Sequence, residues 1–338
     1  MKRLFFLFAS LLIYLMLHSS VALSERVFEE AFFEATFPES DGLVSSLSVA
    51  VSQEKIYCLM GNGAIYCWNP QTKDYRLYAH VPAVPSFNIE TSFSAQSNDI
   101  KEQLSEAVFT LIGAHGHLYG FNPITGTLGR IDEQGIHWNH VQMDTSMLIR
   151  KDSSYPPTIL YPIVDGEELY GFYDMAWEDP NELPLRSVLI SFDLNTGECK
   201  SVDIKKTYAL CPYGIDKLLL LRCDDTDTLI LSIYDRVTGE LQNIDLSIPL
   251  DLELDDYGDW WSVSAQIGGL AYDVNSNAIY LADAIGVWVS RDGGEFTRAK
   301  AVDDGWTHLY PGACAWILSD GSYVLYNGDV FMEQLSNR

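Results

Sequence analysis

The chain has 338 residues, of which 47% are hydrophobic and 20% charged, a globular rather than a disordered composition. Its 21 Lys and Arg residues stand against 47 Asp and Glu residues, which gives a formal net charge of −26. Nucleic-acid binding and attraction to anionic lipid headgroups both need a basic surface, so this charge balance argues against both.

The N-terminal segment has the layout of a secretory signal peptide. Two basic residues precede an apolar run over 4–17, and small residues up to Ala22 fit the cleavage pattern. The run is shorter than the ~20 residues of a membrane-spanning helix. We therefore divide the chain into a signal peptide over 1–22 and a single domain over 23–338. The domain is expected to be secreted or otherwise extracytoplasmic, without membrane insertion after cleavage; an uncleaved N-terminal anchor is the alternative.

Four hairpins along the chain share one turn sequence. A β-rich strand leads into Asn or Asp, two variable residues and Thr, and a second strand follows. The first turn position holds Asn69, Asn122, Asp193 and Asp235, and the fourth holds Thr72, Thr125, Thr196 and Thr238. The next position holds Gly126, Gly197 and Gly239, with Lys73 in the first copy. An Asx side chain bonds forward to the backbone and Gly supplies a positive φ, so we assign these residues a structural role.

Two further units, over 278–299 and 315–334, keep the rhythm of paired strands without the Thr-Gly turn. The corresponding strands of the six units are expected to begin near Ile65, Leu118, Val188, Leu229, Val287 and Tyr323. Runs rich in Val, Ile, Tyr, Phe and Leu with frequent turn signals indicate an all-β fold. Only the segment 97–107 favours a short helix.

Six four-stranded units in one domain resemble a β-propeller. The four hairpins are similar to the D-x-x-T-G blades of pyrroloquinoline-quinone-type propellers, and the segment 290–296 resembles the Asp-box turn of sialidase-like propellers. The resemblance implies a propeller of six four-stranded blades, with seven as the alternative. A strand over 32–37 is expected to close the last blade; an amphipathic helix over 24–35 is the competing interpretation.

Cysteine spacing predicts one disulfide. If Asn62 and Gly63 form a two-residue hairpin loop, Cys58 faces Cys67 at a non-hydrogen-bonded pair, where Cα atoms lie about 4.5 Å apart. That separation is at the low end for disulfides, and the secretory route is oxidising. We expect a Cys58–Cys67 disulfide, with two buried thiols as the alternative. Three pairings stay open among Cys199, Cys211, Cys223 and Cys314.

A propeller gathers distant acidic and tryptophan-bearing loops on the face that also carries the connections between blades. The candidate ligand-binding residues there are Trp177, Glu178, Asp224, Asp225, Asp227, Asp255, Asp256, Asp259, Trp260 and Trp261. Four histidines are expected on the same face: His115, His117, His137 and His140. Carboxylates beside Trp rings can hold a sugar or a cationic group, can bind Ca²⁺, or can receive a protein partner. Ordinary solvated loops are the alternative.

These observations predict a secreted, non-catalytic binding or scaffold module for a carbohydrate, a peptide or a protein. No catalytic residue is assigned and no cofactor is expected, with a Ca²⁺ ion on the clustered carboxylates as the alternative. The alternative is a glycan-acting hydrolase or lyase that uses two carboxylates of the acidic face.

Overall fold

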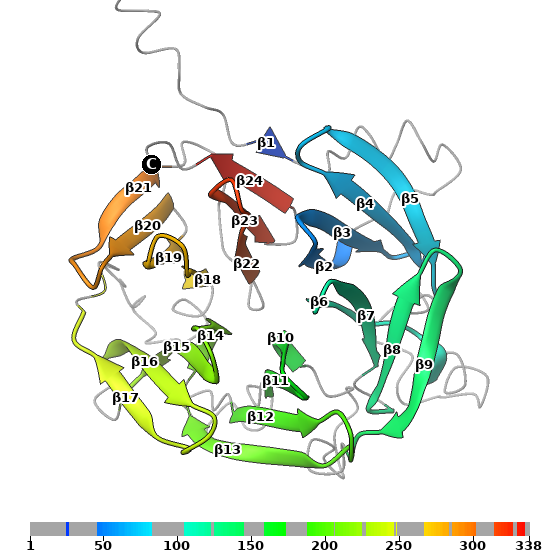
Figure 1. The fold of residues 1–338 in the computed structure, drawn as a ribbon, viewed down its shortest axis with the longest axis horizontal. Coiled ribbons are helices and arrows are strands. Elements are labelled where there is room, and N and C mark those ends of the chain that lie inside the picture. Colours follow the sequence, from blue (N-terminus) through cyan, green and yellow to red (C-terminus); the bar gives the residue numbers. More distant parts are fainter. Residues whose placement is uncertain are drawn as a thin grey trace, which may run out of the picture.

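The computed structural model contains antiparallel four-stranded sheets arranged around an axis, which makes the chain a β-propeller (Figure 1). The structure describes residues 25–26, 46–82, 105–122, 125–144, 159–173, 188–205, 207–224, 228–246, 248, 267–283, 286–301, 314–326 and 330–334. In each sheet, or blade, the strand nearest the axis is called A, and strands B, C and D follow outward.

Blade 1 contains β2 (Ser46–Ser52), β3 (Lys55–Met60), β4 (Ala64–Asn69) and β5 (Asp74–His80). Blade 2 contains β6 (Thr110–Ala114), β7 (His117–Asn122), β8 (Thr127–Asp132) and β9 (Gly135–Gln142). Blade 3 contains β10 (Ile159–Asp165), β11 (Glu168–Tyr173), β12 (Val188–Asp193) and β13 (Cys199–Lys205).

Blade 4 contains β14 (Thr207–Pro212), β15 (Lys217–Cys223), β16 (Leu229–Asp235) and β17 (Leu241–Ile244). Blade 5 contains β18 (Ile267–Asp273), β19 (Ala278–Asp283), β20 (Gly286–Arg291) and β21 (Thr297–Ala301). The closing sheet contains β22 (Cys314–Ile317), β23 (Ser322–Tyr326), β24 (Val330–Gln334) and β1 (Glu25–Arg26).

Five complete blades are continuous in the chain, and this corrects the expected blade count. The remaining sheet has only three consecutive strands, β22 to β24, and β1 takes its outer position by pairing Glu25 with Met332. The expectation of six complete four-stranded units, with seven as the alternative, is therefore corrected to five complete blades and one composite closing sheet. Sharing that sheet between distant parts of the chain joins the ends of the ring. The closing strand expected over 32–37 lies outside the described residues.

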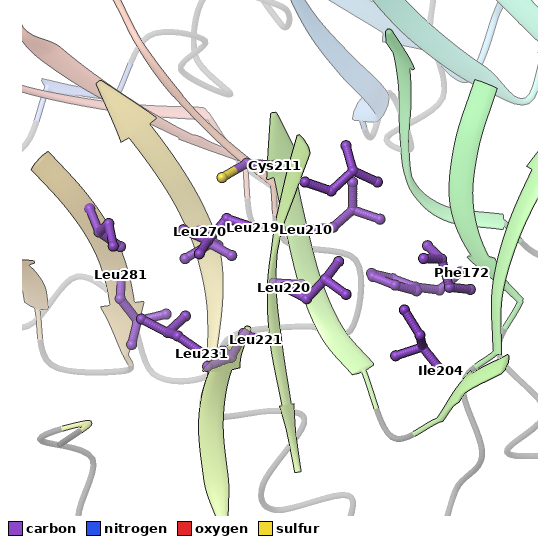
Figure 2. Close-up of a cluster of buried hydrophobic side chains, with 14 of the residues drawn as sticks. Phe172, Ile204, Leu210, Cys211, Leu219, Leu220, Leu221, Leu231, Leu270 and Leu281 are labelled. Carbon is purple, nitrogen blue, oxygen red and sulfur yellow. The ribbon is translucent and has the colours of Figure 1, made fainter. Parts of the chain in front are cut away.

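Neighbouring blades pack face to face, so the strands of a blade are apolar on both sides. In β15, Leu218 to Leu221 are all 0% exposed. Figure 2 shows Leu220 directed toward Phe172 of blade 3, whereas Leu219 lies on the side of Leu270 of blade 5. Strand side chains alternate between faces, so one continuous apolar run supplies two interfaces. Separate buried clusters fill the remaining interfaces and include the one between blade 1 and the closing sheet.

The shared turn sequence does not occupy the same place in every blade. It joins strands C and D in blades 1, 3 and 4, but in blade 2 it joins strands B and C, β7 and β8. The strands expected to begin near Leu118 and Tyr323 are accordingly strands B rather than C. The repeated unit is a hairpin, and a hairpin can begin at either of two strands of a blade.

The turn residues have the structural role that the sequence predicts. The Asp235 carboxylate accepts hydrogen bonds from the backbone N–H groups of Val237 (3.0 Å) and Thr238 (2.9 Å), and Gly239 follows with a φ of 72°. Asp193 and Gly197 repeat this arrangement in blade 3. Lys73 adopts the same left-handed conformation, with a φ of 58°.

The predicted disulfide between Cys58 and Cys67 is wrong because the hairpin loop is one residue longer than expected. Cys58 pairs with Tyr66, and Cys67 pairs with Tyr57. A one-residue slip sends a side chain to the other face of a sheet. Cys58 therefore packs toward the closing sheet and Cys67 toward blade 2, and the two do not form a disulfide with each other. Cys199 and Cys211 are not in disulfides either, while the side chains of Cys223 and Cys314 lie outside the described set.

Close approach of two inner strands predicts that Gly113 tolerates no side chain. A Cβ atom at Gly113 would lie 1.9 Å from the backbone oxygen of Val51 in blade 1. We expect Gly113→Ala to lower the free energy of unfolding by about 3 kcal/mol, because the backbone of β2 must move. Urea denaturation measures the change. In Gly239→Ala no atom lies within 4 Å of the new Cβ, so the positive φ alone costs about 1 kcal/mol. Equal losses in the two variants would contradict the close-approach argument.

The Asx turns predict acid sensitivity. The backbone N–H of Thr238, followed by that of Val237, lowers the pKa of the Asp235 carboxyl below its ordinary value. Stabilisation from a lowered pKa is present above the unfolded-state pKa of about 4 and disappears as the pH falls through the folded-state pKa. Asp235→Asn should therefore be less stable than the parent chain at pH 7, and this deficit should vanish in acid. Thermal melts from pH 7 to pH 2.5 test it. Asn69→Asp is the reciprocal change in blade 1, and this variant should gain the same pH dependence. Parallel curves of melting temperature against pH for the parent chain and both variants would refute the role of the Asp235 carboxylate.

Candidate functional site

The acidic segments that the sequence singles out all leave the propeller at the same end of the strands. Successive strands of a blade run in opposite directions, so its connections alternate between the two ends of the strands. The B–C loops and the connections between blades lie at one end, here called the loop end. The A–B and C–D turns lie at the other end, here called the turn end. The segment 174–187 joins β11 to β12, the segment 224–228 joins β15 to β16, and the segment 245–266 joins β17 to β18. Their attachment points therefore fall on three successive blades, 3, 4 and 5.

Nine of the ten candidate residues themselves lie outside the described residues. They are Trp177, Glu178, Asp225, Asp227, Asp255, Asp256, Asp259, Trp260 and Trp261. Asp224 is described, and it closes its own loop: its backbone N–H donates to the Thr228 carbonyl, and its Oδ1 accepts from the Thr228 N–H, both at 2.9 Å. One oxygen of this carboxylate thus stabilises the loop.

Three of the four histidines lie at the end of the strands opposite to the one that the sequence predicts. His115 lies in the A–B turn of blade 2, with its Nε2 3.3 Å from the Gly166 carbonyl oxygen, and His137 lies 3.0 Å from the Asp132 carboxylate beside the C–D turn. Both positions are at the turn end. His117 begins β7 at that same end, and the side chain of His140 is outside the described set. The expectation failed because the shared turn of blade 2 joins strands B and C and not strands C and D. The loops on either side of it therefore lie at the end opposite to the expected one.

Thiol chemistry is disfavoured at the buried cysteines. Burial raises the pKa of Cys199 to about 12, with a further contribution from the charge of Asp144. Burial also raises the pKa values of Cys67 and Cys211. A thiol with a raised pKa stays protonated at neutral pH and is a poor nucleophile.

At the turn end, polar contacts join one blade to the next. Gln53 of blade 1 donates to the Gly116 carbonyl of blade 2 at 2.8 Å, and His115 contacts Gly166 of blade 3. The backbone N–H of Ser319 in the closing sheet donates to the Glu54 carboxylate of blade 1 at 2.6 Å. These contacts set the relative positions of the turns near the axis.

Arg236 of blade 4 makes a further contact between blades at the turn end, with blade 3. Its side chain is 10% exposed, and its Nη2 lies 2.9 Å from a carboxylate oxygen of Asp165 in blade 3 and 3.0 Å from one of Asp216 in blade 4. Its Nη1 donates to the Asp165 carbonyl at 3.0 Å, and the guanidinium lies over the Tyr170 ring, 5.6 Å from the centroid. The planar guanidinium contacts two blades at once through two nitrogens, a geometry that an ammonium group does not reproduce.

The turn end of blades 4 and 5 also carries exposed aliphatic side chains, which the sequence reasoning missed. Ile215 is 86% exposed, Val237 76% and Val274 68%. The first and third lie in A–B turns, and Val237 lies in the C–D turn of blade 4. The available signal was a comparison of the four shared turns: the position of Val237 holds Gln71 in blade 1, Ile124 in blade 2 and Asn195 in blade 3. Among the three copies that join strands C and D, only that of blade 4 has an aliphatic residue there.

In the described ranges, no three His, Cys, Asp or Glu side chains are placed to hold a metal ion together. The described ranges also contain no helix with the length and hydropathy of a membrane span.

No protein-family model matches the chain, and no curated protein matches it. Several solved structures are similar to the chain. The β-propeller domain of Cps50 (Swd1) from Myceliophteria thermophila is 9% identical with a TM-score of 0.47, over 86% of this chain and 84% of that one. The extracellular domain of a putative one-component system from B. thetaiotaomicron is 11% identical with a TM-score of 0.46, over 87% and 33%. PorZ of Porphyromonas gingivalis, a component of the type-IX secretion system, is 12% identical with a TM-score of 0.44, over 87% and 37%. This chain thus spans about a third of the length of the last two proteins. The similarity assigns no activity to it.

The burial of Arg236 predicts a large penalty for its removal. We expect Arg236→Ala to lower the free energy of unfolding by about 3 kcal/mol, because the partly buried Asp165 carboxylate loses its counter-charge. Chemical denaturation at pH 7 measures it. Arg76→Ala is the matched control: its ion pair with Glu133 also crosses two blades, but both side chains are more than half exposed, so its loss should cost under about 1 kcal/mol. Equal losses of unfolding free energy in the two variants would show that the Arg236 contacts stabilise the protein no more than an exposed ion pair does.

Proposed function

We propose that this chain is an extracytoplasmic, non-catalytic propeller that binds its ligand with loops at the loop end of blades 3, 4 and 5. The observation that carries the proposal is the convergence of the attachment points of the segments 174–187, 224–228 and 245–266 on three successive blades. A rigid scaffold that presents several long loops from neighbouring positions is a common arrangement of binding sites.

The chemistry of these segments supports a carbohydrate, peptide or protein ligand. They contain Trp177, Trp260 and Trp261, whose ring faces can stack on a sugar or attract a cationic group. The same segments carry the seven candidate carboxylates, which can accept hydrogen bonds from sugar hydroxyls or from amino groups, or can hold a Ca²⁺ ion.

The extracytoplasmic location is supported by the signal-peptide layout of residues 1–22. It is tested by sequencing the N-terminus of the exported protein, where cleavage after Ala22 is the expected result. A protein retained in the cytoplasm with residues 1–22 attached would remove this part of the proposal.

The tryptophans give the direct test of the loop-end site. The mature protein is titrated against a panel of soluble oligosaccharides and of neutral and lysine-rich peptides, with product formation followed in parallel. We expect saturable binding without turnover, and a loss of affinity of at least tenfold in Trp177→Ala, Trp260→Ala or Trp261→Ala, because stacking on the ring is lost.

Two carboxylate variants separate binding from catalysis. Glu178→Gln and Asp255→Asn should weaken binding, whereas Glu240→Gln, an exposed carboxylate at the turn end, should not. Turnover of a glycan that either variant abolishes would establish a hydrolase or lyase in place of the binding module. Unchanged affinity in all three tryptophan variants would eliminate the loop-end site. A melting temperature raised by CaCl₂ would add Ca²⁺ as a ligand of the folded chain.

A further inference from the structure

Three exposed aliphatic side chains lie in neighbouring turns at the turn end, away from the loop-end site. We call Ile215, Val237 and Val274 the turn patch. The backbone N–H of Arg236 donates to the Asp216 carbonyl at 2.9 Å, which holds the turn of Val237 beside the turn of Ile215. The rings of Tyr213 and Tyr272, two residues before Ile215 and Val274, lie with centroids 4.3 Å apart, which joins blade 4 to blade 5.

The fold does not require apolar residues at these positions. In the turn of Val237 the geometry comes from the Asp235 carboxylate and from Gly239. The same turn forms in blades 1 and 3 with Gln71 and Asn195 at the position of Val237. The A–B turn of blade 1 likewise presents only polar side chains, those of Gln53 and Glu54. Exposed apolar side chains that no local structure demands are typical of an interaction surface when they are clustered.

The exposed hydrophobic side chains of the described residues are concentrated here. Besides the turn patch, only Leu77 and Leu241 among the large hydrophobic residues of the described ranges are exposed, at 48% and 37%. Leu241 follows the turn of Val237 directly, and Leu77 lies apart on β5 of blade 1. The side chain of Leu77 therefore offers a matched control of similar chemistry in a different blade.

The turn patch has an acidic surround. The five turns 165–168, 235–240, 213–217, 272–277 and 291–295 are linked in that order by one contact after another. They contain nine Asp and Glu residues against three Lys and Arg residues, a local net charge of −6. Of the three cations, Arg236 is already paired with Asp165 and Asp216. The Asp216 side chain remains 53% exposed. Carboxylates at a rim attract a cationic partner and repel an anionic one.

We propose that the turn patch is a docking surface for a polypeptide segment with aliphatic side chains flanked by Lys or Arg. The aliphatic side chains cover Ile215, Val237 and Val274, and the cations meet the surrounding carboxylates. A second copy of this chain would bring two surfaces of the same negative sign together, and an anionic membrane would be repelled for the same reason. This docking surface is independent of the loop-end site, because it lies at the opposite end of the blades.

The experiment uses a defined probe. A fluorescein-labelled 15-residue peptide with three central leucines between lysine-rich flanks is titrated with the mature protein and followed by fluorescence anisotropy. Two companion peptides replace the leucines by serine or the lysines by glutamate. We expect saturable binding of the first peptide, at least tenfold weaker binding of both companions, and a loss of affinity as salt rises from 50 to 500 mM.

The variants test the place of binding. Ile215→Asn, Val237→Asn and Val274→Asn, combined in one protein, should weaken binding of the lysine–leucine peptide at least tenfold. The melting temperature should stay unchanged, because all three side chains are more than two-thirds exposed, and Asn195 already occupies the position of Val237 in a sister turn. Leu77→Asn should leave binding intact, as should Trp177→Ala, which belongs to the other end.

Four results would overturn the docking surface. These are no saturable binding of the lysine–leucine peptide, equal binding of the serine companion, equal binding by the triple variant, and a dimer at 50 mM salt that the triple variant abolishes. The last would identify a second copy as the occupant. Loss of peptide binding in Trp177→Ala alone would instead assign the cationic ligand to the loop end and leave the proposed function standing.

Discussion

The architecture depends on burying both faces of every sheet against neighbouring sheets. In β15 four successive leucines are 0% exposed, and alternate side chains of this strand face blades 3 and 5. A sheet with two apolar faces is stable only between two others, so the row of blades has to close into a ring. The interface between blade 1 and the closing sheet, where Val49 packs in one cluster with Val324, is the place where this closure is made.

Closure also explains where the chain tolerates no side chain. Inner strands of adjacent blades converge on the axis, and at Gly113 the backbone of β2 occupies the space that a Cβ would need. At Gly269 the same convergence allows the Tyr323 hydroxyl of the closing sheet to donate to the Gly269 carbonyl at 2.5 Å. Both glycines join one blade to the next, whereas Gly239 serves only its own turn. Close contacts near the axis thus add to the apolar packing between neighbouring blades.

The two ends of the strands carry different kinds of connecting segment. The long segments leave from the loop end, so their composition can change without altering the packed sheets. The shared C–D turns at the other end keep their Asx residue and a left-handed residue, Lys73 or Gly, but vary at the position held by Gln71, Asn195 and Val237. The two proposals accordingly assign different ligands to opposite ends of one propeller, the first to the segments at the loop end and the second to the turn patch.

Local chemistry is what the sequence by itself determined. The all-β class follows from apolar strand runs and turn signals, and the Asp193 and Asp235 turns follow from contacts within a few residues, which a sequence displays directly. The tertiary structure alone decided the rest. The hairpin of Cys58 and Cys67 gained one loop residue, and the shared turn of blade 2 moved by one strand, because register is set by which face meets which neighbour. The outer place of β1 in the closing sheet comes from the closure of the ring, and the neighbouring positions of Ile215, Val237 and Val274 come from the packing of blade 4 against blade 5. A sequence displays neither arrangement directly, because both join residues that are remote along the chain.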